Sequence, residues 1–146
     1  MVGVPVTDGP CWLRHGLYRA NLALPRVETV LVGAIFIMLQ LGYRTVYVLG
    51  ADHSWHEDVV VDRSNRVCLR DRHFYDTGET KLIPFFKDPN ETTTFTMHET
   101  YRVLGKMFKG YFFISDYARY LNAKIYNASD KTYIDAFDRY DLKNWK

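Results

Sequence analysis

The sequence predicts an α/β fold with a Rossmann-like parallel sheet, and three observations carry this prediction. First, the segment 28–41 is apolar on almost every side, as in a buried helix, and Gly42 follows its end. Second, a short β-branched and aromatic run at 45–49 comes directly after that helix. Third, a similar run at 124–126 follows a long amphipathic segment. Strands separated by a helix usually pair in parallel, with a right-handed crossover.

A β-hairpin insertion is expected between these two strands. Two valine-containing runs, 59–61 and 67–69, flank a segment at 62–65 that is rich in turn formers. The stretch 71–96 has little periodicity and contains two prolines. We therefore expect it to be irregular, and either functional or mobile.

Three further helices are expected. Thr96 and Glu99 have the spacing of a capping box and mark the start of a long helix that runs to about Asn122. A short turn of helix is expected at 12–18, and a last short helix at 133–140.

The length of the chain limits its organisation. Its 146 residues suffice for a single domain over 1–146. A parallel sheet of only two or three strands would be poorly buried, because such sheets are normally covered on both faces. We therefore expect the sheet to be incomplete here or to be completed by another chain, and we expect self-association through the exposed apolar surface beside its strands.

Composition excludes several classes of protein. Hydrophobic residues make up 47% and charged residues 25%, which excludes a mostly disordered chain. Lysine and arginine number 19 against 17 acidic residues, and no basic stripe is visible, so nucleic acid is not an expected partner. Aromatic residues reach 16%, which suits a core and also suits sites that stack sugars or nucleobases.

We expect a cytoplasmic protein. The first residues have no basic start and no apolar stretch of signal-peptide length. The longest apolar run, 30–39, is about half of what a bilayer span needs, so no transmembrane segment is expected. Two cysteines, Cys11 and Cys68, are too few for a disulfide scaffold and favour a reducing compartment.

The best candidate site follows the first predicted strand, because ligands of open α/β sheets bind beyond the carboxyl ends of the strands. Most residues there can donate, accept, titrate or stack, and the candidates are Gly50, Asp52, His53, Ser54 and Trp55. Asp52 is the first acid after the strand and is expected to face the ligand. The alternatives are that Asp52 caps the loop and that His53 is a packing residue.

Two later segments add candidates. His73 and Tyr75 stand in a cluster that follows the hairpin, where a histidine beside aromatic residues can also serve packing alone. His98 lies near the start of the long helix, where backbone N–H groups and the helix dipole favour anions. It is a candidate general base, with a surface histidine of no special role as the alternative. We expect Asp52, His53, His73 and His98 to converge on one cleft.

No metal site is predicted. Four histidines fall in these loops with Asp52 and Glu57, and imidazoles and carboxylates suit zinc or manganese. However, the spacing of His53 and His56 on an irregular loop matches no established ligand geometry. The glycine motifs of dinucleotide-binding proteins and of P-loops are also absent from the sequence.

The segment LGYRTVYVLGAD at 41–52 resembles the pattern LGY-x-x-I-Y-L-x-G-x-D of bacterial family 42 sialyltransferases and of the related MptE-like proteins. The resemblance covers roughly residues 28–129, and it continues through His98, the long helix and the segment KIYNAS at 124–129. It implies that His98 is the general base, and it adds Asn127 and Ser129 to the candidate substrate-binding residues. Ser54 and Trp55 stand where the family has tyrosines that contact the nucleotide phosphate.

This resemblance implies a glycosyltransferase of bacterial surface polysaccharide or lipopolysaccharide synthesis, in the cytoplasm or at the inner membrane surface. It would transfer a sugar from a nucleotide-sugar donor to a glycan acceptor, without a metal or another cofactor. The strand and the phosphate-holding loop with which these families begin have no counterpart here. The chain is therefore expected to be the carboxyl-terminal part of a larger domain.

Two alternatives stay open. One is an MptE-like enzyme of the 6-hydroxymethylpterin pyrophosphokinase type, which would need magnesium held by carboxylates such as Asp52. The other is an inactive binding or scaffold fragment that pairs with a partner chain.

Overall fold

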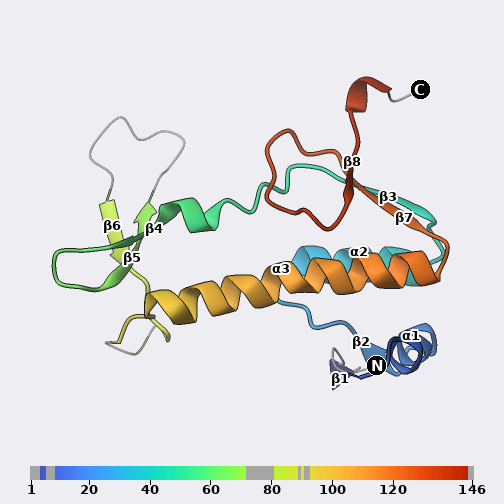
Figure 1. Cartoon of the computed structure of the whole chain (residues 1–146), viewed down its shortest axis with the longest axis horizontal. Helices are drawn as coiled ribbons and strands as arrows, with labels where there is room; N and C mark the ends of the chain where they lie inside the picture. The colour runs from blue at the N-terminus through green and yellow to red at the C-terminus, as the bar shows by residue number, and fades with distance from the viewer. Residues whose placement is uncertain (1–3, 6–8, 72–80, 89, 91–92, 145–146) are drawn as a thin grey trace. The chain divides into compact units, whose positions relative to one another are not determined.

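The computed structural model describes residues 4–5, 9–71, 81–88, 90 and 93–144. The chain divides into two compact units (Figure 1). The first consists of Met1–Asp52 together with Lys106–Lys146, and the second of His53–Gly105.

A three-stranded parallel sheet forms the centre of the first unit. Its strands are β3 (Thr45–Val48), β7 (Lys124–Asn127) and β8 (Asp138–Arg139), in the order β3-β7-β8. Val46 lies opposite Ile125 in the pairing of β3 with β7. The structure thereby confirms an α/β chain in which the two predicted strands pair in parallel.

Three helices accompany this sheet along the chain (Figure 1). They are α1 (Cys11–Arg19), α2 (Val30–Gln40) and α3 (Met97–Tyr120), and the two-residue strands β1 (Val4–Pro5) and β2 (Ala23–Leu24) pair in parallel around α1. Thr29 caps α2, because its side-chain oxygen accepts a hydrogen bond from the backbone N–H of Val32 at 3.4 Å. The helix begins at Val30, two residues after the predicted start of the segment 28–41.

The core of this unit lies between one face of the sheet and two helices. Its buried side chains include Val46 and Val48 of β3, Ile125 of β7, Val32, Ile35 and Leu39 of α2, and Tyr111, Ile114 and Tyr117 of α3. The tyrosine hydroxyls in this core have partners, as buried polar groups require. The hydroxyl of Tyr117 donates to Oε1 of Gln40 at 2.7 Å.

Helix α1 contacts α3 through a buried ionic cluster. Nη2 of Arg14 donates to Oδ2 of Asp116 at 3.0 Å. Nε2 of His15 lies 3.1 Å from the same oxygen, without the direction of a hydrogen bond. Burial lowers the pKa of His15 from its usual 6.5, and the nearby Arg14 guanidinium lowers it further, against the opposing effect of Asp116.

This cluster makes stability depend on pH. Since the pKa of His15 is lower in the folded protein, the unfolded chain binds more protons in the window below pH 6.5. The free energy of unfolding should therefore fall as the pH drops from 7.5 to 5.5, and a His15→Gln variant should lose less of it. Urea unfolding of both proteins at the two pH values measures this. An equal pH dependence would contradict the assignment to His15.

The second unit contains an antiparallel sheet of β4 (Val59–Val61), β5 (Val67–Asp71) and β6 (Lys81–Pro84), preceded by the 3₁₀ turn η1 (Trp55–Asp58). The predicted hairpin is confirmed, with Val61 opposite Val67. Its turn is closed by Asp62, whose Oδ1 accepts from the backbone N–H groups of Ser64 and Arg66. The capping box of α3 is confirmed as well, because Glu99 Oε2 accepts from the backbone N–H of Thr96 at 2.9 Å.

Two predictions about elements are wrong. Part of the stretch expected to be irregular is strand β6, which pairs with β5 along its whole length and ends at Pro84, a residue tolerated on a sheet edge. The expected last helix at 133–140 is absent, and strand β8 lies there instead. The backbone N–H of Tyr140 donates to the carbonyl of Asn127, which draws this segment into the sheet.

Apolar side chains remain exposed beside the parallel sheet. Tyr43 and Leu49, which precede and follow β3, are 53% and 57% exposed. The incomplete sheet and the self-association that we expect from such a surface remain predictions. Among the residues that the structure describes, no helix is both long enough and apolar enough to cross a membrane.

Candidate active site

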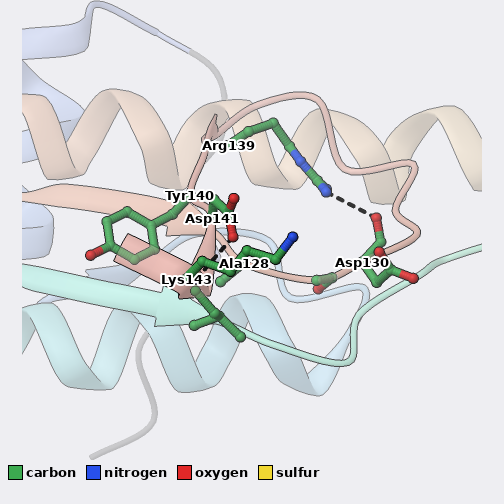
Figure 2. Close-up of a pocket in the computed structure, with 8 residues that line it drawn as sticks. Ala128, Asp130, Arg139, Tyr140, Asp141 and Lys143 are labelled. Carbon is green, nitrogen blue, oxygen red and sulfur yellow. Dashed lines mark hydrogen bonds between the residues drawn. The ribbon is translucent and has the colours of Figure 1, made fainter. Parts of the chain in front are cut away.

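A pocket of about 440 Å³ opens at the carboxyl ends of β7 and β8 (Figure 2). It is lined by Ala128, Ser129 and Asp130, which follow β7, and by residues 139–143, which begin in β8. Both its size and its place at the carboxyl edge of a parallel sheet are typical of small-molecule sites in α/β proteins.

The wall of the pocket is supported from below by Asn127, whose side chain is fully buried. Its Nδ2 donates to the hydroxyl of Thr132 at 2.9 Å and to the carbonyl of Ile134 at 3.2 Å. Its Oδ1 accepts from the backbone N–H of Ser129 at 3.1 Å. Asn127 therefore fixes the loop after β7 from the inside and does not line the pocket itself.

The same loop is tied to the end of β3. The backbone N–H of Ala51 donates to the hydroxyl oxygen of Ser129 at 3.1 Å, and the hydroxyl of Thr132 donates to the carbonyl of Ala51 at 2.8 Å. The backbone N–H of Tyr133 donates to the carbonyl of Asp52 at 2.8 Å. Gly50 precedes this junction with a φ of +67°, a conformation that favours glycine. The carboxyl ends of β3 and β7 thus form one connected edge.

Two cations and two acids line this edge. Nη2 of Arg139 donates to the backbone carbonyl of Asp130 at 2.9 Å, so that the long side chain extends over the pocket (Figure 2). Asp141 accepts at Oδ1 from the backbone N–H of Lys143 at 2.9 Å. A guanidinium has five N–H donors, so Arg139 keeps donors for a ligand. The ammonium of Lys143 is a second group that can bind the oxygen atoms of an anion, whereas Asp130 and Asp141 in the same lining are acidic.

Four of the residues predicted from the sequence lie at this edge of the first unit. Ser129 lines the pocket, and Asn127 supports it. Gly50 and Asp52 stand where β3 ends, and the side chain of Asp52 is exposed. The strand-end rule and the resemblance therefore pointed to one connected region of the sheet.

The remaining predicted residues do not belong to the first unit as the structure describes it. His53, Ser54, Trp55 and His98 belong to the second unit, and His73 and Tyr75 lie outside the described residues. The convergence of Asp52, His53, His73 and His98 on one cleft therefore stays a prediction.

His53 has two unusual features. It is 7% exposed and adopts a φ of +57°, which is uncommon for a residue with a side chain. Its ring lies 4.6 Å from the ring of Trp55, centroid to centroid. This burial favours the packing alternative for His53, whereas Trp55 is half exposed.

His98 is exposed in the first turn of α3, and its contacts select a tautomer. The hydroxyl of Thr96 donates its single hydrogen to Oε2 of Glu99 at 2.9 Å. The hydrogen bond of 3.0 Å between that hydroxyl oxygen and Nδ1 of His98 must therefore be donated by the imidazole. In this tautomer Nε2 carries no hydrogen and can accept a proton.

Glu99 is kept ionised and so accepts the hydrogen bond from the hydroxyl of Thr96. Nζ of Lys87 donates to Oε1 of Glu99 at 2.8 Å. This hydrogen bond and those from Thr96 lower the pKa of Glu99 to about 2. The carboxylate consequently remains an acceptor for the hydroxyl of Thr96 over the whole physiological pH range.

The residues that sequence reasoning missed include Thr132, Arg139 and Lys143, together with the two acids of the lining, Asp130 and Asp141. The incorrect helix at 133–140 would have placed Arg139 on a helix surface. Thr132 precedes that segment, where nothing distinguishes it from other turn residues. Within the described part of the chain, no three His, Cys, Asp or Glu side chains come together as metal ligands. Comparison with known proteins finds no matching family model, curated protein or solved structure.

Proposed function

We propose that the chain carries the nucleotide-sugar site of a Rossmann-like glycosyltransferase, of the kind that builds bacterial surface polysaccharides. The observation that carries this proposal is the pocket at the carboxyl edge of the parallel sheet, with Arg139, Lys143 and the buried Ser129 in its lining. Guanidinium, ammonium and hydroxyl groups are the side chains that proteins use to bind phosphate oxygens. A nucleotide sugar brings such oxygens to the site.

The proposed reaction is the transfer of a sugar to a hydroxyl group. By the resemblance to family 42 sialyltransferases, Nε2 of His98 would take the proton of the acceptor hydroxyl, and the oxygen of that hydroxyl would attack the anomeric carbon of the donor sugar. The bond between that carbon and the phosphate oxygen breaks, and the nucleotide leaves with the bonding electron pair. The tautomer selected through Thr96 supports this role, because it leaves Nε2 free of hydrogen. Asp52 would orient the nucleotide or the acceptor.

Arg139 and Lys143 should carry most of the affinity for the donor phosphate. We expect Arg139→Ala and Lys143→Ala each to weaken the binding of CMP, and of nucleotide sugars that contain it, by about 10-fold. Isothermal titration calorimetry measures the affinities. Arg63→Ala is the matched control, because Arg63 is an exposed arginine in the hairpin turn of the second unit. The affinity of this variant for CMP should be unchanged.

The titration also separates the rival functions. Equal affinity in the Arg139, Lys143 and Arg63 variants would place the phosphate elsewhere and contradict the proposal. Binding of a hydroxymethylpterin that requires magnesium would support the pyrophosphokinase alternative instead. A chain that binds none of these compounds would support the scaffold alternative.

A further inference from the structure

Four residues beneath the pocket form a closed ring of hydrogen bonds. The hydroxyl of Thr132 donates to the carbonyl of Ala51, and the N–H of Ala51 donates to the hydroxyl oxygen of Ser129. The N–H of Ser129 donates to Oδ1 of Asn127, and Nδ2 of Asn127 donates back to the hydroxyl oxygen of Thr132. Every distance in the ring lies between 2.8 and 3.1 Å.

The direction of each bond in this ring is fixed. Two of the donors are backbone N–H groups, so the oxygen of the Asn127 amide must face Ser129 and its nitrogen must face Thr132. The hydroxyl oxygen of Thr132 also accepts from the backbone N–H of Ile134 at 3.2 Å. With two donors directed at that oxygen, the single hydrogen of Thr132 goes to the carbonyl of Ala51.

The ring leaves the hydroxyl hydrogen of Ser129 unused. The backbone N–H of Ser129 donates to Asn127, and its hydroxyl oxygen accepts one hydrogen bond, from Ala51. No acceptor for its hydroxyl hydrogen is found among the residues that the structure describes. The residue is 4% exposed, and it lines the pocket. A buried donor without an acceptor costs free energy, and a ligand that supplies an acceptor removes this cost.

We propose that Thr132 is a positioning residue, which orients the peptide of Ala51 so that Ser129 donates its hydroxyl hydrogen to an acceptor oxygen of the bound ligand. The hydroxyl of Thr132 donates to the carbonyl of Ala51, and the backbone N–H of the same residue donates to the hydroxyl oxygen of Ser129. Thr132 thus acts on the ligand through two intermediate groups without touching it.

This arrangement specifies the class of ligand atom that the pocket takes. The hydroxyl hydrogen of Ser129 is satisfied by a group with lone pairs, such as a phosphate or carboxylate oxygen, and would stay unpaired beside an ammonium group. Rejection of the wrong group is strong when a buried polar group would be left unpaired. The assignment of that oxygen to a nucleotide phosphate rests on the proposed function, whereas the role of Thr132 does not.

Two substitutions of Thr132 separate the effect of its hydroxyl group from the effect of its side-chain volume. Thr132→Val removes the hydroxyl at nearly constant volume, and Thr132→Ser keeps it. We expect amide hydrogen exchange at Ala51 to become about 10-fold faster in Thr132→Val and to stay near the native rate in Thr132→Ser. The affinity for sodium pyrophosphate and for CMP should fall about 10-fold in Thr132→Val and be largely rescued by serine.

Ser129→Ala completes the test. It should weaken pyrophosphate and CMP binding by about 10-fold, and adding Thr132→Val to it should cause little further loss, because both act through the same hydroxyl. Unchanged affinity in Ser129→Ala would overturn the proposal. This result is decisive even if the Thr132→Val variant does not fold. Unchanged exchange at Ala51 in a folded Thr132→Val protein would overturn it as well. If the unaltered protein bound neither probe, the proposed function would fail, and the exchange data would still decide the role of Thr132.

Discussion

A His98→Ala variant should transfer sugar about 10²–10⁴-fold more slowly than the unaltered protein, with nearly the same affinity for the nucleotide. In the proposed mechanism the imidazole acts on the acceptor hydroxyl, so its loss should lower the rate of the chemical step and leave the contacts to the donor in place. Steady-state kinetics with a nucleotide-sugar donor, on this chain or on a longer protein that contains it, measures the rate. Calorimetry with CMP measures the affinity.

Two further variants make this experiment specific. Asp52→Ala should weaken substrate binding more than it slows the chemical step, because an acid at the end of a strand is expected to hold the ligand. His56→Ala removes a second histidine of the same unit and should retain normal turnover. Normal turnover in His98→Ala would contradict the proposed mechanism, provided that melting curves show both proteins to be folded.

The largest loss of stability is expected for Asn127→Leu. The change removes an amide that makes three hydrogen bonds. The N–H of Ser129 and the carbonyl of Ile134 thereby lose their hydrogen bonds to Asn127. Each buried group left unpaired costs about 1–3 kcal/mol, so the free energy of unfolding should fall by about 4 kcal/mol. For a chain of this size the Tm should fall by roughly 10–15 °C.

Thermal melting followed by circular dichroism measures this loss. Asn90→Leu is the matched control, because Asn90 is exposed and an exposed substitution usually changes stability by about 0.5 kcal/mol or less. A Tm of Asn127→Leu within a few degrees of the native value would show that the buried amide is not what holds the loop after β7.

Much of the fold could be predicted because it depends on local patterns. The apolar helix α2, the valine runs around the turn at 62–65 and the capping box of Thr96 and Glu99 are each encoded within a dozen residues. Strands β6 and β8 are not. β6 is four residues long and ends in proline, and β8 is two residues long. Both are stabilised by pairing with a strand that is distant in the sequence or separated by a loop, which no local period records.

The same distinction applies to the candidate site. Gly50 and Asp52 were predicted because they follow a strand that the sequence shows clearly, and Ser129 was predicted through the resemblance. Arg139 and Thr132 reach the site only because the segment after β7 folds back toward the ends of β3 and β7. That path is set by the buried amide of Asn127, a tertiary contact, and it overrides the helical spacing that the sequence suggests at 133–140.

We propose above all that the pocket at the carboxyl edge of the parallel sheet binds a nucleotide phosphate. Titration of the ¹⁵N-labelled protein with CMP, followed by NMR, tests it most directly. We expect the largest shifts at the amides of Ala51, Ser129, Asp130 and Arg139, and we expect these shifts to saturate together. The absence of shifts at these amides, or shifts confined to the unit His53–Gly105, would contradict it.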